Sequence, residues 1–386
     1  MSSLKTYTEK FHSFETPFYF YDIGLLRKTL NLINESIKKR PFEIHYALKA
    51  NVNRRILKEI QEAGFGADCV SGNEVIRAVE SGFEKEKIVF AGVGKSDREI
   101  KLGIEYDIYA FNVESIEELF VLDEIAGSMG KRVNFALRIN PNVDAGTHHY
   151  ITTGTRNNKF GITVDELIEL LPQIRGLQYV SFLGLHFHIG SQIRDIDRYR
   201  ELCERINGLQ KILIGEGFKL KDINVGGGLG IFYDDPEKEL IPDFKTYFDL
   251  FNKNLQLEEG QRVHFELGRS VVGQCGSLIS RVLYSKPGSE KSFLVLDAGM
   301  TELIRPALYQ AYHHIEKLTP SDHQKKIYDI VGPICESSDA FVRDLKFPVS
   351  QRGDLMAIRS CGAYAEVMSS RYNLREVAPS VFSDEI

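Results

Sequence analysis

The sequence predicts an α/β protein built from a (β/α)8 TIM-like barrel and a C-terminal, mainly antiparallel β domain. Two observations support this. Short β-type runs alternate with amphipathic helical patterns over roughly 220 residues, a size typical of such barrels. After Arg269 the helical repeat stops, and short β-type runs follow one another between Gly, Pro and Asp turns. A doubly wound open sheet is the alternative, but eight parallel units favour closure.

The expected barrel strands are eight short apolar runs. In chain order they are Ile44–Leu48, Ala67–Val70, Ile88–Ala91, Ile108–Asn112, Val133–Ile139, Gly184–Ile189, Asp222–Val225 and Val263–Glu266. Apolar residues at helical spacing separate most of them. These helices are expected at Ile23–Ile37, Glu74–Glu80, Ile116–Glu124, Val164–Leu171, Tyr199–Gly215 and Phe244–Leu255. The pattern places a barrel domain at residues 24–268.

The second domain is expected to combine residues 1–23 with residues 269–386. The aromatic run Pro17–Tyr21 has the composition of a strand that could pair with it. Further β-type runs are Val271–Val272, Leu278–Leu283, Ser292–Leu296, Lys326–Val331 and Gly353–Ile358, and a helical turn is expected near Pro306–His313. Because strands follow strands here, this domain should be mainly antiparallel.

Composition excludes several classes of function. The formal net charge of -6 gives no basis for binding nucleic-acid phosphates. No stretch approaches the roughly 18 apolar residues of a membrane helix, and no signal sequence is evident at the start. The five cysteines are scattered without a C-x-x-C pair, so neither a disulfide framework nor a metal site is expected. These features predict a cytoplasmic protein with reduced thiols.

A lysine ends the first expected barrel strand, in His45-Tyr46-Ala47-Leu48-Lys49. Reactive groups of such barrels gather at the C-terminal ends of the strands. Burial there would lower the pKa of the Lys49 amine and favour a Schiff base. The alternative is a lysine that simply reaches water, as most do.

A glycine-rich loop, Gly226–Gly230, follows the seventh expected strand. Without side chains, its backbone N–H groups can surround an anion such as a phosphate. The hydroxyl of Ser191 could contribute another donor. A tight turn between strand and helix is an equally good interpretation of three consecutive glycines.

Two histidines and a carboxylate end other expected strands. His186 and His188 lie two residues apart, so on a strand they would face the same way. Stacking of one of them on an aromatic cofactor ring fits better than a metal pair, because no third ligand is evident. Glu266 could hold a pyridine nitrogen protonated. Arg269 could grip a phosphate or carboxylate, although the two residues could also form a salt bridge in a turn.

Two stretches of the second domain carry further reactive groups. Cys335 and Glu336 stand side by side on an expected loop, and a cysteine with a pKa near neutrality can donate a proton to a carbanion. A free cysteine is more often a small buried hydrophobe. Tyr364 could reach a phosphate with its hydroxyl, although most tyrosines pack.

Together these residues resemble the fold-type III pyridoxal-phosphate-dependent amino-acid decarboxylases, which have the alanine racemase/ornithine decarboxylase-like fold. The matching stretches are Tyr46–Asn51, Lys159–Ile162, His186–Gln192, Gly226–Gly230, Glu266–Arg269, Asp297–Tyr312, Cys335–Asp339 and Gly362–Tyr364. Within that family the chain resembles the diaminopimelate decarboxylases, on the stretches Asp297–Tyr309, Val143–His148 and Cys335–Asp339. Leu267 departs from the family pattern, which has proline at this position.

The resemblance implies pyridoxal 5'-phosphate as cofactor and decarboxylation of meso-2,6-diaminopimelate to L-lysine and CO2, the last step of lysine biosynthesis. By resemblance the catalytic residues are Lys49, which carries the cofactor covalently, His188, which stacks on its ring, and Cys335, the proton donor. The other implied cofactor-binding residues are Ser191, Gly227, Gly228, Glu266, Gly268, Arg269 and Tyr364. Substrate binding is implied for Arg269, Arg305, Tyr309, Glu336 and Tyr364. The family also implies a homodimer in which the Cys335 loop reaches the partner's barrel.

Other interpretations remain open at this stage. A decarboxylase of the same fold could act on ornithine, arginine or carboxynorspermidine instead. A racemase is less compatible, because racemases of this fold resemble a pattern with arginine at the pyridine nitrogen. A non-catalytic binding protein would have no use for Lys49 and Cys335, and a cofactor-free Schiff-base aldolase would leave Glu266 unexplained.

Overall fold

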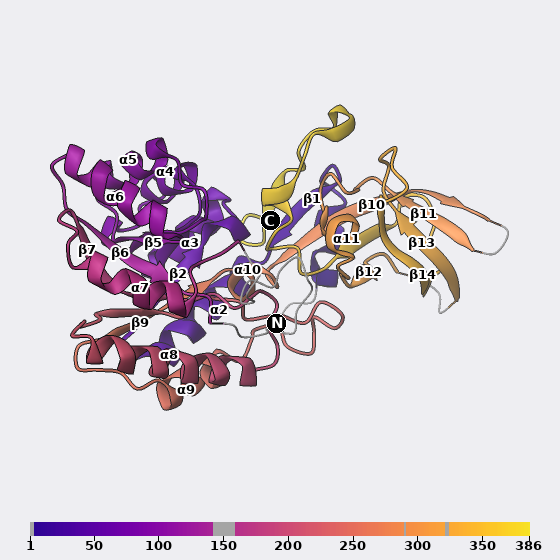
Figure 1. The fold of residues 1–386 in the computed structure, drawn as a ribbon. Coiled ribbons are helices and arrows are strands. Elements are labelled where there is room, and N and C mark those ends of the chain that lie inside the picture. The colour runs from indigo at the N-terminus through magenta and orange to yellow at the C-terminus, as the bar shows by residue number, and fades with distance from the viewer. Residues whose placement is uncertain (1–3, 142–158, 289–290, 321–323) are drawn as a thin grey trace. The chain divides into compact units, whose positions relative to one another are not determined.

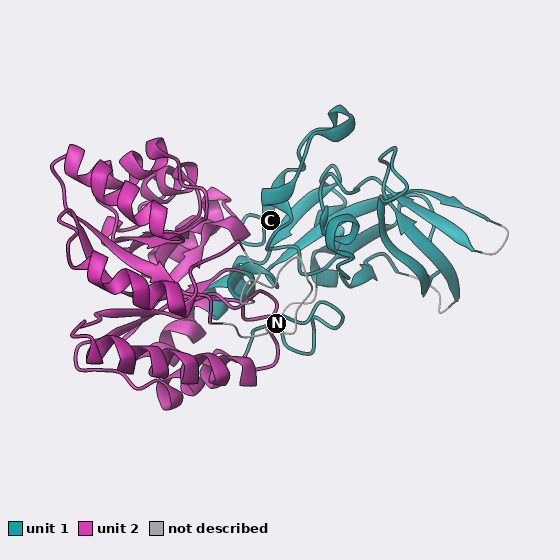
Figure 2. Cartoon of the chain, in the orientation of Figure 1, with its two compact units in different colours: residues 1–29, 231–242, 269–386 teal, residues 30–230, 243–268 magenta. Residues whose placement is uncertain are grey.

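The computed structural model describes residues 4–141, 159–288, 291–320 and 324–386. The stretch 143–148, which supports the resemblance, lies outside these residues. The chain forms two compact units (Figure 2). The barrel unit comprises residues 30–230 and 243–268, and the β unit comprises residues 1–29, 231–242 and 269–386. Residues 24–29 and 231–242, expected in the barrel domain, thus cluster with the β unit.

Eight parallel strands close into a barrel in the order β2 to β9 (Figure 1). They are β2 (Phe42–Ala47), β3 (Gly66–Cys69), β4 (Ile88–Phe90), β5 (Ala110–Val113), β6 (Val133–Arg138), β7 (Val180–His186), β8 (Asp222–Asn224) and β9 (Arg262–Leu267). The ring closes because β2 pairs with β9, so that Ile44 lies beside Phe265. The prediction of a closed barrel is confirmed, and the open-sheet alternative is wrong.

Helices connect the strands around the barrel. They are α2 (Ile23–Ile37), α3 (Arg54–Glu62), α4 (Gly72–Glu80), α5 (Asp97–Glu105), α6 (Ile116–Ser128), α7 (Val164–Ile174), α8 (Asp197–Gly215) and α9 (Phe244–Asn254), with short 3-10 turns at Leu48–Ala50 and Lys85–Lys87. Local sequence fixes their starts. Thr163 and Glu166 form a capping box at α7, for example. No helix in the described ranges is both long and apolar enough to cross a bilayer.

Strand β9 shows how the sequence separates the barrel interior from the helical layer. Phe265 packs against helix α9, with its ring 4.9 Å from that of Phe248 and 5.1 Å from that of Phe251. Because strand side chains alternate, His264 and Glu266 face the other way. The barrel interior therefore receives a column of polar side chains from this strand.

The β unit contains an eight-stranded sheet. Its strands are β1 (Phe18–Tyr21), β10 (Gly276–Lys286), β11 (Ser292–Leu296), β12 (Ile315–Lys317), β13 (Lys325–Val331), β14 (Ala340–Pro348), β15 (Leu355–Ile358) and β16 (Ser380–Phe382). Most pairs are antiparallel, but β11–β13 and β1–β16 are parallel. The short helices of this unit are η1 (Leu4–Tyr7), α1 (Thr8–Phe11), α10 (Arg269–Val272), α11 (Arg305–Tyr309), η5 (Glu366–Met368) and η6 (Tyr372–Leu374).

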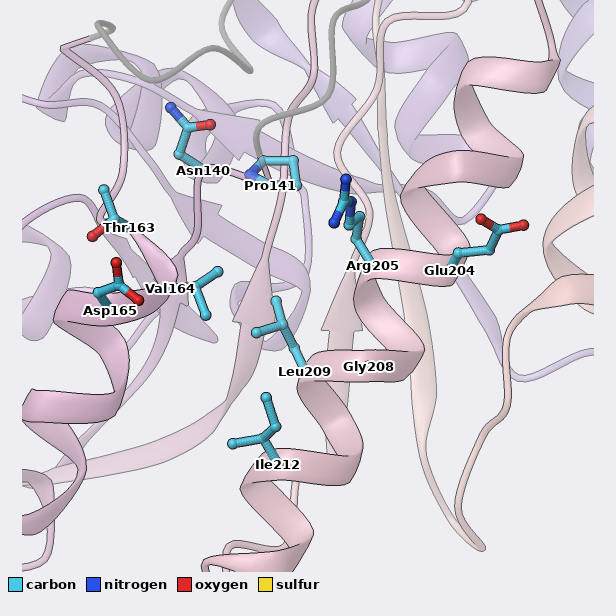
Figure 3. A pocket seen from close by; sticks show the side chains of 10 residues that line it. All are labelled: Asn140, Pro141, Thr163, Val164, Asp165, Glu204, Arg205, Gly208, Leu209 and Ile212. Atoms are coloured by element: carbon cyan, nitrogen blue, oxygen red, sulfur yellow. The ribbon is translucent and has the colours of Figure 1, made fainter.

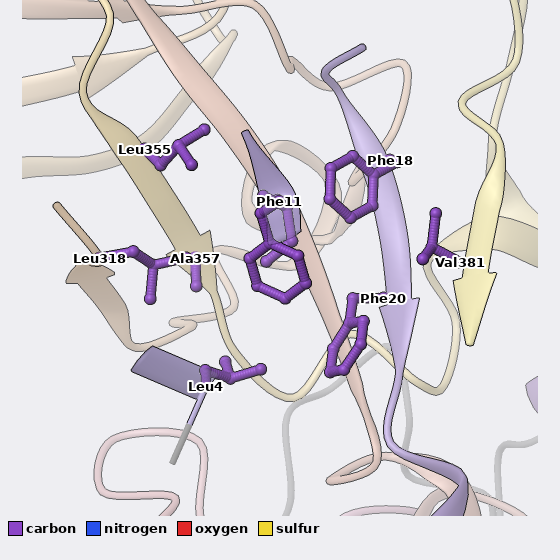
Figure 4. Packing of buried hydrophobic residues seen from close by; sticks show 9 residues of the cluster. Leu4, Phe11, Phe18, Phe20, Leu318, Leu355, Ala357 and Val381 are labelled. Carbon is purple, nitrogen blue, oxygen red and sulfur yellow. The ribbon is translucent and has the colours of Figure 1, made fainter. Parts of the chain in front are cut away.

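The N-terminal segment completes this sheet. β1 pairs with β10, placing Phe18 beside Ile279, and its other edge pairs with β16. Phe11, Phe18 and Phe20 then pack with aliphatic residues of the later strands in one buried cluster (Figure 4). Burial of such rings contributes roughly 1.5–3 kcal/mol each, which explains why this segment joins a sheet formed more than 250 residues later in the chain.

Two features of this unit differ from the sequence-based expectation. Val271 and Val272 lie in helix α10 and not in a strand, because the chain turns helically after β9, with Gly273 N donating to Arg269 O at 2.8 Å. β-branched residues favour strands only weakly, so local chain geometry overrides the preference. Strands β12, β14 and β16 were not expected; β14, for example, carries the charged residues Arg343, Asp344 and Lys346.

Candidate active site

The C-terminal ends of the barrel strands bring together several ionisable residues. Lys49 lies in the turn that follows β2, Asp68 in β3, His186 at the end of β7 and Glu266 in β9. We call these four residues the C-terminal group. Arg138, at the end of β6, is instead engaged in a buried ion pair with Glu114 at 2.7 Å.

Glu266 is a buried carboxylate that contacts three nitrogen-bearing side chains. Its Oε1 accepts from Asn112 Nδ2 at 3.0 Å and from Asn224 Nδ2 at 2.7 Å, and its Oε2 lies 3.1 Å from His186 Nε2. Burial alone would raise the pKa of Glu266, but His186 and Lys49 hold it below its ordinary value. The barrel therefore maintains one fixed negative charge in its interior.

Lys49 is the nearest basic group to Asp68, with Nζ 3.8 Å from Oδ2. The Lys49 side chain is 38% exposed, so the expectation that burial at the strand end desolvates it is wrong. It lies in a 3-10 turn beyond the strand, not within the strand itself. Asp68 is buried, and neither of its carboxylate oxygens has a hydrogen-bond partner among the described residues. Burial and the charge of Glu266 raise the pKa of Asp68.

His188 and the glycine loop contact each other directly. The backbone N–H of Gly227 donates to His188 Nδ1 at 3.3 Å. Burial and the charges of Lys49 and Arg138 lower the pKa of His188, so its ring stays neutral. The two histidines therefore have different partners: His186 bonds Glu266 within the strand, whereas His188 lies beyond it beside the loop.

Backbone packing explains two glycines of the loop. A Cβ on Gly227 would lie 1.8 Å from the carbonyl oxygen of Glu266, and Gly228 has a φ of +100°. Neither position tolerates a side chain. The same loop pairs with the segment that carries Ser191, since Ile193 N donates to Gly228 O at 2.8 Å. Ser191 and the glycine loop thus lie on adjoining segments, as a joint anion site requires.

Gly268 follows β9 and lies next to the Lys49 turn. A Cβ there would meet the Cβ atoms of Ala50 at 3.0 Å and Ala47 at 3.2 Å. Leu267, at the position where the family has proline, is fully buried and pairs with Tyr46 in the barrel ladder. Leucine can provide a backbone N–H at this position, which proline lacks.

Within the β unit, Arg269 lies among aromatic rings. Its Nη1 donates to the Tyr233 hydroxyl at 2.5 Å, and its guanidinium lies 4.7 Å from the centre of the Tyr364 ring. Burial would lower the pKa of Arg269, but Tyr233, Tyr364 and Tyr309 raise it overall. Arg305, the first residue of α11, is also buried, and its guanidinium lies over the ring of Tyr233. The four expected residues Arg269, Arg305, Tyr309 and Tyr364 thus belong to one unit.

Cys335 and Glu336 lie on a loop that is fixed from both sides. The buried carboxylate of Asp339 accepts from Ile334 N and from Met300 N, each at 2.7 Å. On the other side, Tyr372 donates its hydroxyl to Glu336 Oε1 at 2.6 Å, and Cys335 N donates to Asn373 Oδ1 at 3.2 Å.

Cys335 is exposed, whereas the four other cysteines are buried. Exposure leaves its thiol available to a reactant.

A separate cavity lies on the helical side of the barrel unit (Figure 3). Its volume is about 760 Å3, and it lies between the start of α7 and the middle of α8. Its lining consists of Asn140, Pro141, Thr163, Val164, Asp165, Glu204, Arg205, Gly208, Leu209 and Ile212. None of the expected site residues is among them, so this cavity is not the candidate active site.

Several residues that the sequence did not single out form hydrogen bonds to the predicted site residues. Asn112 and Asn224 bond Glu266, Tyr233 and His313 bond the two arginines, and Asn373 bonds the Cys335 loop. Asn112 could have been found, because it is the one polar residue of strand β5, whereas Asn224 shares its short strand β8 with the charged Asp222. Tyr233 and His313 carry no such signal, since tyrosine and histidine are common in ordinary cores.

These residues fit pyridoxal phosphate. The site offers an amine, a neutral imidazole beside a glycine loop, and an interior carboxylate that remains ionised. Asp68 in addition places beside the amine a carboxylate that has no hydrogen-bond partner among the described residues. Such a donor set suits a cofactor with an aldehyde, a phosphate and a basic ring nitrogen. No group of three or more His, Cys, Asp or Glu in the described parts of the chain is arranged to hold a metal ion.

Comparison with known proteins shows the family to which the chain belongs. Residues 24–273 match the family model of the pyridoxal-dependent decarboxylases, pyridoxal binding domain. The chain is 53% identical over 379 residues to a diaminopimelate decarboxylase of Bacteroides thetaiotaomicron, covering 98% of each chain. A solved Helicobacter pylori diaminopimelate decarboxylase complexed with L-lysine superposes with a TM-score of 0.93 at 39% identity, covering 98% of this chain and 94% of that one. A lysine/ornithine decarboxylase of Vibrio vulnificus, at 18% identity and a TM-score of 0.86, shares the fold.

Proposed function

The chain belongs to the pyridoxal-dependent decarboxylases and to their diaminopimelate decarboxylase branch, and we propose that it converts meso-2,6-diaminopimelate to L-lysine and CO2. It is then a carboxy-lyase that catalyses the last step of lysine biosynthesis, with pyridoxal 5'-phosphate as cofactor. When bound, the cofactor accepts the electrons of the breaking Cα–carboxylate bond into its protonated ring. The protein supplies binding, orientation and proton transfer.

The observation that supports this proposal most strongly is the state of Glu266. Three side chains donate to this buried carboxylate, and its pKa is lowered. A fixed negative charge at this depth stabilises a protonated pyridine nitrogen, which strengthens electron withdrawal. A cofactor-free aldolase or a simple binding protein would gain nothing from a buried charge, which is costly to desolvate.

In the barrel unit, Lys49 is proposed to hold the cofactor covalently through Nζ. Its turn leaves the side chain 38% exposed, so an incoming amino group can reach it. The neutral ring of His188 is proposed to stack on the cofactor ring. Ser191 with Gly227 and Gly228 would bind the phosphate of the cofactor through a hydroxyl and backbone N–H groups.

The β unit is proposed to recognise the rest of the substrate. After loss of CO2 at the D centre, the L centre still carries an amine and a carboxylate at the far end. Arg269, Arg305 and Tyr309 would bind the carboxylate, and Glu336 the amine, because each charge needs an opposite partner once water is excluded. Tyr364 would contact cofactor and substrate through its hydroxyl. Cys335 Sγ would deliver a proton to the reacting carbon.

We further propose that the protein works as a cytoplasmic homodimer with shared active sites. The face that carries Cys335 and Glu336 also exposes large apolar side chains, with Leu374 95% and Tyr372 48% exposed. Leu374 in addition has a φ of +56°, a conformation that costs about 1 kcal/mol or more for such a residue. A second copy covering this face would bury that surface and bring its own barrel to the Cys335 loop.

Release of CO2 from meso-diaminopimelate by the purified protein with added pyridoxal phosphate tests the proposal. We expect equimolar L-lysine and CO2, and a cofactor-sized mass on the Lys49 peptide after borohydride reduction. The Lys49→Arg variant keeps the charge but should lose both the mass and at least about 1,000-fold in activity. CO2 release from ornithine, arginine or carboxynorspermidine, but not from diaminopimelate, would refute the proposed substrate. Absence of any cofactor on Lys49 would refute the enzyme class.

A further inference from the structure

Arg305 is a buried cation without a buried anion. Arg305 is 6% exposed, and in the described residues no carboxylate lies within ion-pair distance of it. Its contacts are instead the imidazole of His313, with Nη1 2.7 Å from Nε2, and the ring of Tyr233, whose centre lies 4.6 Å from the guanidinium carbon. A buried guanidinium is normally paired. We therefore expect Arg305 to bind an anion that the protein itself does not supply.

The neighbours of His313 allow only one protonation state of its ring. Nδ1 lies 2.9 Å from the carbonyl oxygen of Arg359, which can only accept, so Nδ1 carries the hydrogen. Nε2 faces Arg305, whose guanidinium can only donate, so Nε2 must offer its lone pair. Burial and the charge of Arg305 lower the pKa of His313 to about 3. The ring therefore stays neutral and acts as an acceptor.

Tyr233 fixes the other side of the cluster. Its ring meets that of His313 edge-on, with centres 4.8 Å apart, and its hydroxyl accepts from Arg269 at 2.5 Å. Two guanidinium groups are thus held near one tyrosine. Burial, with a smaller contribution from the charge of Arg269, lowers the pKa of Arg305. Among the described residues no carboxylate offsets the charge of Arg305, so the site can attract an anion.

We propose that His313 is a positioning residue that determines specificity for a substrate with a carboxylate at its far end. By accepting from Nη1, His313 fixes the plane of the Arg305 guanidinium and leaves the Nη2 edge available for a carboxylate. This inference rests on the proposed function, in which Arg305 binds that carboxylate. A guanidinium held in one orientation loses less entropy when it forms a bidentate pair.

Two substitutions of His313 separate positioning from packing. His313→Asn retains an N–H near the Nδ1 position but has no acceptor at the Nε2 position. His313→Gln can place its amide oxygen near the Nε2 position and retains the acceptor. For the asparagine variant we expect KM for meso-diaminopimelate to rise about ten- to hundred-fold with kcat within about twofold. The glutamine variant should stay within about threefold of wild type in both parameters.

Binding of two small amines provides a readout that does not depend on turnover. L-lysine carries the far carboxylate, whereas cadaverine is the same diamine without it. We expect the Kd of L-lysine to rise in His313→Asn by the same factor as KM, with the Kd of cadaverine unchanged. His314→Asn, at the adjacent and partly exposed histidine, is the matched control and should leave both constants unchanged. If His313→Asn does not fold, His313→Met removes the acceptor with a side chain of similar size.

Several outcomes would overturn the proposal. Equal weakening of L-lysine and cadaverine would show that His313 only supports packing, as would a glutamine variant as impaired as the asparagine variant. A wild-type protein that releases no CO2 from meso-diaminopimelate would refute the proposed function instead, and the two Kd values would still decide the role of His313. A wild-type protein that binds L-lysine no better than cadaverine would refute the carboxylate site itself.

Discussion

Both ends of the barrel contain buried ionisable side chains, but the two ends differ in how these side chains are hydrogen-bonded. At the N-terminal ends of the strands, a set of side chains bonds to one another, which we call the N-terminal group: His45, Tyr109, Asp222, Arg262 and His264. At the opposite end, the C-terminal group leaves both oxygens of Asp68 without a hydrogen-bond partner among the described residues. The same residue types therefore stabilise one end and leave the other able to bind.

Asp222 is the centre of the N-terminal group. It accepts from the Tyr109 hydroxyl and from Arg262 Nε at 3.2 Å, and its Oδ1 lies 3.1 Å from His264 Nε2. Burial would raise the pKa of Asp222, but His264, Tyr109 and Arg262 lower it overall. By contrast, burial and Glu266 raise the pKa of Asp68. A carboxylate with donors on each side is a structural element, whereas one without them is available for chemistry.

The largest effect is expected at the catalytic end. Glu266→Gln preserves the shape of the side chain but removes the negative charge that its three partners surround. We expect kcat/KM to fall on the order of 10²–10³-fold, the usual loss for one electrostatic group in an active site. Steady-state kinetics with saturating pyridoxal phosphate would measure it. Activity within threefold of wild type would show that the charge of Glu266 has no catalytic role.

A matched pair of carboxamide variants compares the two ends directly. Asp222→Asn removes the charge that Tyr109 and Arg262 contact, and should lower the free energy of unfolding by about 1.5–3 kcal/mol. Asp68→Asn removes a buried carboxylate without hydrogen-bond donors, and should change it by less than about 1 kcal/mol or stabilise the fold. Urea unfolding followed by circular dichroism measures both. Equal losses would contradict the distinction between the two ends.

Acid should weaken the N-terminal group gradually. Burial and the neighbouring His264 lower the pKa of His45 from 6.5 to about 3. Because the folded pKa is the lower one, the unfolded chain binds the proton first, so stability falls as the pH drops below about 6.5. The loss approaches about 1.4 kcal/mol per pH unit for this histidine.

Urea midpoints between pH 7.5 and 5 would reveal this effect. His45→Gln should reduce the pH dependence by the contribution of one proton, whereas His12→Gln, at an exposed site, should leave it unchanged. An unchanged slope in the His45 variant would mean that the imidazole is protonated in the folded protein.

The fold was largely predictable because its main signals are local. The helical pattern from Ile23 to Ile37 matches α2 at both ends, and Ser292–Leu296 matches β11. The expectation failed where the sequence of a run carries no clear periodic pattern. Strand β14 mixes Arg343, Asp344 and Lys346 with apolar residues and is held by a long ladder with β13. No alternation in its own sequence distinguishes it from a polar loop.

The candidate site was predictable in its residues but not in their environment. Motifs identified Lys49, Glu266 and Cys335, because each is an unusual choice for the place it occupies. Their surroundings came from strands far away in the sequence: Glu266 is bonded by Asn112, 154 residues earlier. The partial exposure of Lys49 also contradicts the expectation of a buried strand end.

The sequence by itself determined the alternation of strands and helices, the separate β-rich part and the set of reactive residues, since periodicity and residue type are local properties. Only the tertiary structure decided which of these residues come into contact and with which hydrogen-bond partners. Closure of β2 onto β9 completes the ring whose interior contains Glu266, and the fold of the β unit brings His313 to Arg305. Hydrogen-bond partners and pKa shifts depend on distances within a few ångströms between segments that the sequence places far apart.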